Sequence, residues 1–247
     1  MNSLRRLLRV FDLFRPEQPV IDVDIICQEL GYTPATAYRY LRELGDAGFL
    51  KRLPRGYALG PRIVTLEHQM ANYDPLLACS RDLVDRLVDD TGLDALVSEW
   101  HGDSVVNVLI QRGSDVGPVG GDRGRPIDLF HSATSRVVLA YLLPRQIRRI
   151  YDAHAIPSGL LHLGLAWKPF TKSLLAIRKQ GYCISESELH PGRSGVAAPI
   201  FDEKKRRVLG SMTLVGRSER FRAFQPGYLC DLVTGAASEL TARIALQ

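Results

Sequence analysis

The stretch TPATAYRYLRELGDAGFLKRLPRGYALG, residues 33–60, decides the fold of the first part of this 247-residue chain. Thr33 followed by Pro34 is typical of a helix N-cap and first helical residue, and we expect the helix to continue to about Ala47. At about 100° per residue, its apolar side carries Ala37, Leu41 and Leu44. Its opposite side carries Ala35, Tyr38, Arg39 and Arg42. One side therefore packs inward, and the other is available to a partner.

Two shorter helices are predicted upstream of this stretch. The first begins with Ser3 as its N-cap and ends before Pro16. The second runs from Asp22 or Asp24 to Leu30, where the following glycine supplies a left-handed residue. Downstream, FLKRL and YALG predict two short strands joined by a tight turn. Helix, helix, short turn, helix and hairpin is the order of a winged helix-turn-helix.

Exposed basic residues in this segment indicate DNA as the partner. In a helix-turn-helix the recognition helix enters the major groove, and flanking elements contact phosphates. Arg39 and Arg42 are able to donate paired hydrogen bonds to guanine or phosphate. The predicted DNA-binding residues are Thr33, Pro34, Ala35, Thr36, Tyr38, Arg39, Arg42, Lys51, Arg52 and Arg55. The alternative is a solvated basic face, but five basic residues stand against two acidic ones between residues 33 and 55, in a chain of net charge +5.

The composition, 45% hydrophobic and 24% charged, is ordinary for a globular protein. The four cysteines show no C-x-x-C and no Cys/His metal-ligand spacing, so we expect free thiols and no metal. The N-terminus has no signal-peptide pattern, and no segment reaches the roughly 18–20 apolar residues of a membrane span. These features predict a cytoplasmic protein with no membrane partner.

A second domain is predicted to begin near residue 74. A helix from about Pro61 to Ala71 leads toward it, and Pro75 opens another helix that ends at Gly92. Further predicted elements are strands at 94–100, 104–110 and 126–130, helices at 132–143, 144–154 and 171–180, strands at 182–187, 195–201 and 208–216, and a helix at 224–246. Helices segregated between and after runs of strands predict an α+β domain built on an antiparallel sheet.

Motifs along nearly the whole chain resemble the IclR family of bacterial transcription regulators. SLRRLLRVFDLF, ICQELGYTPATAYRYLRELGDAGFLKR and YALGPRIVTL resemble its DNA-binding part, and LFHSATSRVVLAYL, IRKQGYCISESELHPGRSGVAAPIFD and GSMTLVG resemble its effector-binding part. The resemblance implies a winged helix-turn-helix at 1–60, a linker helix at 61–74 and a GAF-like effector-binding domain at 75–247. It also implies a homodimer or homotetramer that binds a double-stranded DNA operator and senses a small-molecule effector, commonly an organic or aromatic acid of a catabolic pathway.

The resemblance further implies an effector site in the second domain. By position, its residues are Ser132, Thr134, Ser135, Ser185, Glu188, Arg193, Gly195, Ser211 and Thr213. The chain departs from the family pattern at Ser135-Arg136, where many members have Gly-Lys, and at Arg193, where many have an apolar or small residue. A guanidinium at the pocket would suit a carboxylate ligand. The alternative is that Arg193 points to solvent.

Other motifs do not favour catalysis. PGRSGV around Ser194 lacks the second glycine of a nucleophile elbow, because Val196 occupies that position. GGDRGRP at 120–126 lacks the Gly-Lys-Ser/Thr of a phosphate-binding loop. His131 is expected to cap a helix or line the pocket. We therefore expect a regulator with no catalytic residue and no cofactor; the alternative, a small-molecule-converting enzyme with an N-terminal association domain, lacks a nucleophile with an identifiable base.

Overall fold

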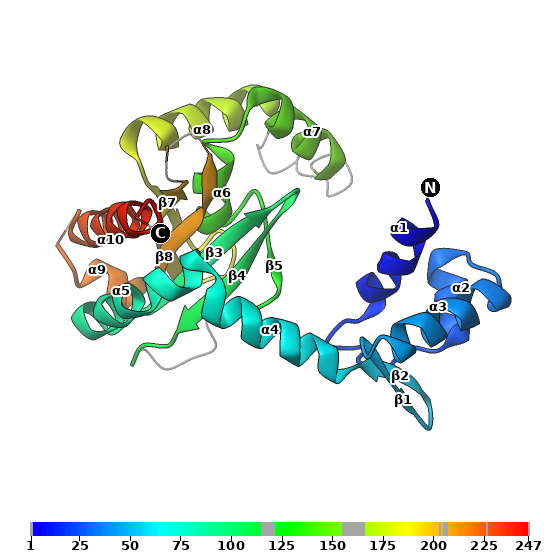
Figure 1. Ribbon diagram of the computed structural model, residues 1–247. Helices are drawn as coiled ribbons and strands as arrows, with labels where there is room; N and C mark the ends of the chain where they lie inside the picture. Colours follow the sequence, from blue (N-terminus) through cyan, green and yellow to red (C-terminus); the bar gives the residue numbers. More distant parts are fainter. Residues whose placement is uncertain are drawn as a thin grey trace. The chain divides into compact units, whose positions relative to one another are not determined.

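The computed structural model divides into two compact units, Met1–Asp74 and Pro75–Gln247 (Figure 1). The residues that it describes are 2–114, 122–154, 166–202, 204, 207–225 and 227–246. Part of the glycine-rich segment GGDRGRP therefore lies outside the described residues. Within the described residues, no helix is long and apolar enough to cross a membrane.

The first unit contains the predicted helices and hairpin in the predicted order. Its elements are α1 (Ser3–Leu8), the 3-10 helix η1 (Arg9–Leu13), α2 (Val23–Leu30), α3 (Pro34–Asp46), β1 (Leu50–Leu53), β2 (Gly56–Leu59) and α4 (Pro61–Tyr73). The predicted caps of α2 and α3 are confirmed: Gly31 is left-handed at φ 67°, and the Thr33 hydroxyl accepts from the Thr36 amide at 3.4 Å. The predicted cap of α1 is wrong by one residue, because Asn2 Oδ1 accepts from the Leu4 amide at 2.8 Å.

A small hydrophobic core holds η1, α2, α3 and the hairpin together. Its buried residues are Val10, Leu13, Ile21, Ile26, Tyr32, Ala37, Tyr40, Leu41, Leu44 and Leu50. The predicted apolar side of α3 is confirmed, since Ala37 and Leu41 are fully buried and Leu44 is 4% exposed. Packing this side inward leaves the other side of α3 at the surface.

The hairpin is joined by a third backbone segment that the sequence did not predict. Ile21 pairs with Tyr57 of β2, with N–H to O distances of 2.9 and 2.7 Å in the two directions. Gly56 makes this pairing possible: its φ is 143°, and a Cβ there would lie 2.4 Å from the Ile21 carbonyl oxygen. The wing is therefore fixed to the chain that precedes α2.

The second unit is built on one six-stranded antiparallel sheet of order β5-β4-β3-β8-β7-β6. Its elements are α5 (Pro75–Thr91), β3 (Asp94–His101), β4 (Ser104–Gln111), β5 (Pro126–Ile127), α6 (Ala133–Leu139), α7 (Pro144–His154), α8 (Trp167–Gln180), β6 (Cys183–Glu186), β7 (Arg193–Phe201), β8 (Val208–Arg217), α9 (Ser218–Arg222) and α10 (Tyr228–Ile244). The predicted α+β class with an antiparallel sheet is confirmed. Two details were wrong: β5 has only two residues, and a separate short helix, α9, precedes the closing helix.

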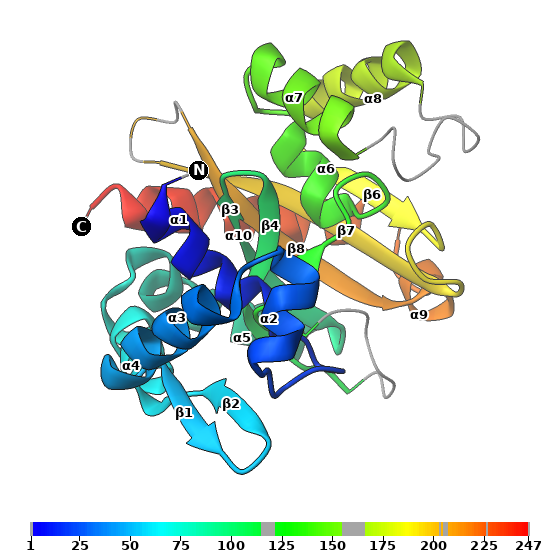
Figure 2. The ribbon, with the colours of Figure 1, turned by 90° about the vertical axis from the view of Figure 1, so that its right-hand side faces the viewer.

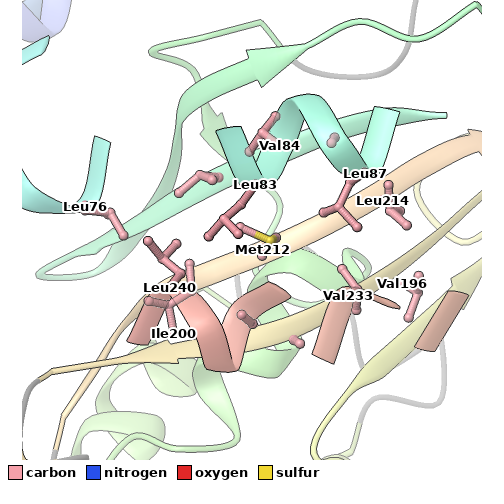
Figure 3. Packing of buried hydrophobic residues seen from close by; sticks show 14 of the residues in the cluster. Leu76, Leu83, Val84, Leu87, Val196, Ile200, Met212, Leu214, Val233 and Leu240 are labelled. Atoms are coloured by element: carbon pink, nitrogen blue, oxygen red, sulfur yellow. The ribbon is translucent and has the colours of Figure 1, made fainter. Parts of the chain in front are cut away.

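Both faces of the central strands are covered (Figures 1 and 2). On one face, α5 and α10 enclose side chains that include Leu83, Val196, Met212 and Leu240, as Figure 3 shows. On the other face, α6, α7 and α8 pack with residues that include Val105 and Ala197. Because side chains alternate along a strand, the neighbours of Val196 and Met212 in sequence face the α6 side. This alternation places the polar residues Ser211 and Thr213 of β8 next to α6, and with them the small residues Gly195 and Ala197 of β7.

Candidate functional site

The exposed side of α3 carries the predicted DNA-binding residues at the surface of the first unit. Tyr38 is 63% exposed, and Arg39 and Arg42 are also exposed. The Arg39 guanidinium lies over the Tyr40 ring, with its Cζ 5.3 Å from the ring centroid. Arg42 makes a long ion pair of 3.5 Å with Glu43, a pair of two exposed side chains that contributes little rigidity. The Arg42 guanidinium is thus able to reach an anionic partner at low cost.

The start of α3 and the hairpin supply the other predicted residues. At the helix start, Thr33, Pro34 and Ala35 are exposed, whereas Thr36 is half-buried, and the two threonine hydroxyls lie 3.0 Å apart. In the hairpin, the exposed basic residues are Lys51, Arg52 and Arg55. The free amide groups at a helix N-terminus favour a phosphate there. The predicted residues therefore form two surfaces of the first unit. One is the start and the exposed side of α3, and the other is the basic β1–β2 hairpin, the wing.

Two tyrosines orient α3, and the sequence reasoning missed both. Tyr40 is 3% exposed, and its hydroxyl donates to the Ser3 carbonyl oxygen at 3.3 Å. Tyr32 donates to the Arg6 carbonyl oxygen at 3.0 Å, and the two tyrosine rings meet edge to face with centroids 5.9 Å apart. The available signal was spacing, since Tyr40 lies three residues after Ala37 and four before Leu44. These bonds fasten α1 to α3 and to the turn that precedes it.

A cavity of about 290 Å³ lies in the second unit beside the start of α6. Six of the nine predicted effector residues line it: Ser132, Thr134, Ser185, Arg193, Gly195 and Thr213. They come from α6 and its N-cap, from β6, and from two central strands, and the antiparallel register pairs Ser185 with Gly195. Arg193, for which solvent was the alternative, is half-buried and belongs to the lining.

Hydroxyl groups form the floor of this cavity. The Thr134 and Thr213 hydroxyls lie 3.1 Å apart, with residues 4% and 2% exposed. Ser211 is fully buried and lies outside the lining, but its hydroxyl donates to the Thr134 carbonyl oxygen at 3.0 Å and so supports the lining. Because a buried hydroxyl needs its hydrogen bond, this arrangement fixes α6 against β8.

Two further predicted residues also lie outside the lining. Ser135 is fully buried on the next position of α6, and its hydroxyl has no hydrogen-bond partner among the described residues. Glu188 turns away to pair with Arg136 at 2.8 Å. His131, expected as a cap or a lining residue, pairs with Asp128 at 3.0 Å and is not in the lining.

Sequence reasoning missed several lining residues, both polar and apolar. They include Asn107, Arg125, Asp128, Leu189 and His190. Asn107 was detectable as the one amide within the apolar strand SVVNVLI; its Oδ1 accepts from the Ser98 hydroxyl at 2.7 Å. Leu189 and His190 belong to the loop already selected by resemblance, whereas Arg125 comes from the glycine-rich segment, where nothing in the pattern indicated a role.

Among the charged residues of the cavity lining, arginines outnumber carboxylates. Arg125 and Arg193 are its two arginines, and Asp128 is its one carboxylate among the described residues. Asp128 Oδ1 already accepts from the amides of Phe130 and His131, at 2.8 and 2.6 Å. This carboxylate oxygen therefore stabilises the turn before α6. A carboxylate ligand would meet guanidinium and hydroxyl donors, which is a favourable combination. No cluster of potential metal ligands occurs in the part of the chain that the structure describes.

Comparison with known proteins gives matches along most of the chain. The IclR helix-turn-helix domain matches residues 3–54, and the family described as bacterial transcriptional regulator IclR C-terminal matches residues 68–242. The Pca regulon regulatory protein of Pseudomonas putida is 26% identical over 233 residues, which are 89% of this chain and 77% of that protein.

Solved structures share the fold. A protein described as an IclR transcriptional regulator from Silicibacter sp. TM1040 has a TM-score of 0.84 at 22% identity, over 99% of this chain and 96% of that one. An IclR homolog from Microbacterium hydrocarbonoxydans, complexed with 4-hydroxybenzoate, has a TM-score of 0.76 at 15% identity, over 100% of each chain. The matched families are those of regulators, as expected, rather than of enzymes. With its helix-turn-helix and its C-terminal domain both matched in order, this chain belongs to the IclR family of bacterial transcription regulators.

Proposed function

We propose that this regulator binds an operator through α3 and the wing, and that an organic acid bound in the cavity of the second unit controls that binding. The observation that carries the proposal is the cavity itself, whose lining includes both Arg125 and Arg193 and the buried hydroxyls of Thr134 and Thr213. The cytoplasm, where DNA and metabolites are both available, is the proposed location.

The DNA part of the proposal rests on the separation of roles in the first unit. Arg39 and Arg42 project from the outer side of a helix whose start is exposed, which suits contacts with base edges in a major groove. Lys51, Arg52 and Arg55 project from a short hairpin, which suits phosphate contacts without sequence information.

The effector part rests on size and charge. About 290 Å³ is at the small end of the roughly 300–1,000 Å³ typical of small-molecule sites, so a ligand with one ring fits better than a nucleotide. Leu96, Ile127 and Leu189 give the lining an apolar part, and the arginines give it an anion-binding part. An aromatic carboxylate satisfies both, and the Microbacterium homolog with the same fold is complexed with one, 4-hydroxybenzoate.

Regulation further requires that two arrangements of the protein differ in their affinity for DNA. We propose a homodimer or homotetramer on a two-fold symmetric operator, with α4 as the linker helix between the DNA-binding domain at 1–60 and the GAF-like effector-binding domain at 75–247. The effector shifts DNA affinity only by its own differential affinity for the two arrangements. The sign of this shift decides between repressor and activator.

Calorimetric titration of the full chain tests the effector part. Benzoate, 4-hydroxybenzoate and succinate are compared with the neutral amides benzamide and 4-hydroxybenzamide. We expect an aromatic acid to bind at least about tenfold more tightly than its amide, because a charge-assisted hydrogen bond is lost in the amide. Arg193→Gln should remove that preference, whereas Arg145→Gln, at an exposed position on α7, should retain it. Equal affinity for acid and amide in the wild-type protein contradicts the proposed ligand class.

Gel-shift titration against DNA flanking the gene tests the DNA part. A salt series separates specific binding from general attraction to phosphate. No preference over random DNA of equal length, with and without the acid, contradicts the proposal.

A further inference from the structure

The loop between β6 and β7, residues 187–192, closes one side of the effector cavity. Leu189 and His190 from this loop belong to the cavity lining. The loop is folded upon itself: the Ser187 amide donates to the Arg193 carbonyl oxygen at 2.6 Å, and the Gly192 amide donates to the Ser187 hydroxyl at 3.1 Å. Ser187 has a φ of 55°, which is an unfavourable conformation for a residue with a side chain. Contacts with the rest of the unit must hold it there.

One ion pair ties this loop to the helix on the other side of the cavity. Arg136 Nη2 donates to Glu188 Oε1 at 2.8 Å and to the Ile184 carbonyl oxygen at 3.1 Å. Arg136 lies two residues after Thr134, which lines the cavity, and Glu188 lies directly before Leu189, which also lines it. The pair therefore connects the two lining segments through residues that lie one and two positions from lining residues in the sequence.

The surroundings of this pair differ from those of an ordinary surface pair. The Arg136 side chain is 14% exposed, against 38% for Glu188, and Arg136 Nε is buried without a hydrogen-bond partner among the described residues. Beside it, burial raises the pKa of the Cys183 thiol to about 11. Because most of the Arg136 side chain is withdrawn from water, its guanidinium depends on Glu188, and removal of that carboxylate leaves a poorly solvated charge.

We propose that Arg136 and Glu188 are positioning residues for effector binding, a pair that holds the β6–β7 loop closed against α6 and so places Leu189 and His190 on the bound effector. The expected effect on effector affinity rests on the proposed function. The expectation that the ion pair holds the loop in place rests on the contacts alone. When the pair is broken, the loop is no longer held against α6. Part of the free energy of effector binding must then be used to order the loop. Effector affinity falls while affinity of the effector-free protein for DNA does not change.

Hydrogen–deuterium exchange of the full chain without ligand tests the mechanism. In Glu188→Gln, the amides of Ser187, Gly192 and Arg193 should exchange about 5- to 10-fold faster, because a local opening that exposes them costs less. Arg136→Lys keeps the charge and should retain most of the protection. The control is Glu186→Gln, an equal charge change two residues away at an exposed position that makes no ion pair in the described part of the chain. Unchanged exchange of the loop in Glu188→Gln overturns the proposal.

A titration with 4-hydroxybenzoate separates this proposal from the proposed function. If the wild-type protein binds this acid, Glu188→Gln should weaken binding about 3- to 10-fold, with most of the change in the dissociation rate. If the wild-type protein does not bind it but Glu188→Gln still loosens the loop, the ligand class is wrong and the positioning pair stands. If exchange rises throughout the second unit instead, the pair only stabilises the fold, and the proposal fails.

Discussion

The two units place their polar groups in opposite ways. In the first unit, Tyr38, Arg39 and Arg42 are exposed on one side of α3, and the helix is held from its other side. In the second unit, Thr134 and Thr213 are almost fully buried and bonded to each other beneath a cavity. An exposed charge acts through long-range attraction and tolerates small displacements, whereas a buried hydroxyl acts only in one geometry. We therefore expect substitutions in the first unit to act on affinity for DNA, and polar substitutions in the second to act on structure and effector together.

The largest effect is expected from truncating a side chain in the small hydrophobic core of the first unit. Leu41→Ala removes a fully buried side chain from a cluster of ten buried residues and should cost about 2–5 kcal/mol of that unit's stability. Both tryptophans, Trp100 and Trp167, lie in the second unit, so tryptophan fluorescence reports on that unit alone.

Urea unfolding checks whether the two cores are independent. In Leu41→Ala, loss of helical circular dichroism should begin at lower urea while the tryptophan transition remains in place. The matched change Leu240→Ala, also at a fully buried leucine, should move the tryptophan transition. A common shift of both signals in Leu41→Ala contradicts the independence of the units.

The next effect concerns the outer side of α3. Arg39→Ala and Arg42→Ala should each lose about 1–3 kcal/mol of operator binding if they contact bases, with little change on random DNA. Lys51→Ala should weaken binding to both, and should lower the slope of log affinity against log salt by about 0.9. Gel shifts at three salt concentrations give these quantities. Equal loss on operator and random DNA in the α3 variants would assign those arginines to phosphate.

Local sequence signals predicted the first unit well, because caps and turns are specified by adjacent residues. Thr33, Pro34 and Gly31 each determine backbone geometry within a few residues of themselves, so the bounds of α2 and α3 were accessible. The pairing of Ile21 with Tyr57 was not, since the two residues are 36 positions apart and only the packed fold brings them together. Tyr40 was missed because its phenol ring packs inward while its hydroxyl finds a partner on α1.

The cavity depended more on resemblance than on local pattern. Strand alternation accounts for Thr213 and Gly195 on the α6 side, but it does not say which polar residues border an open space. Arg125 and His190 enter the lining through loops, and loop paths depend on distant contacts that no periodicity encodes. Glu188 was predicted to line the cavity because of its position in the β6–β7 loop. Its carboxylate instead pairs with Arg136, and the residue lies outside the lining.

A smaller effect is expected from the cavity floor. Thr213→Val keeps the shape but removes the hydroxyl that lies 3.1 Å from the Thr134 hydroxyl, at a cost of about 1 kcal/mol in stability of the second unit. The same change should weaken binding of an aromatic acid, because the α6 start is less firmly held. Thermal unfolding followed by tryptophan fluorescence, with and without 4-hydroxybenzoate, measures both. Thr65→Val, on exposed α4, serves as the control and should change neither. A more stable protein with unchanged ligand affinity would mean that the hydroxyl pair has no role in the site.

The smallest effect concerns the rates at which the four free thiols of the two units react with an alkylating reagent. Cys27 in the first unit is half-buried, whereas Cys79, Cys183 and Cys230 in the second are buried. Burial raises the pKa of Cys183 to about 11, and it also raises the pKa of Cys230. Because the thiolate is the reactive form, a raised pKa leaves very little reactive Cys183 at pH 8. Iodoacetamide labelling followed by peptide mass spectrometry should therefore find Cys27 modified first. In urea, Cys183 should react at a comparable rate, since unfolding returns its pKa toward the ordinary value and admits the reagent. Fast labelling of Cys183 in the folded protein would show that water reaches the region behind the Arg136–Glu188 pair.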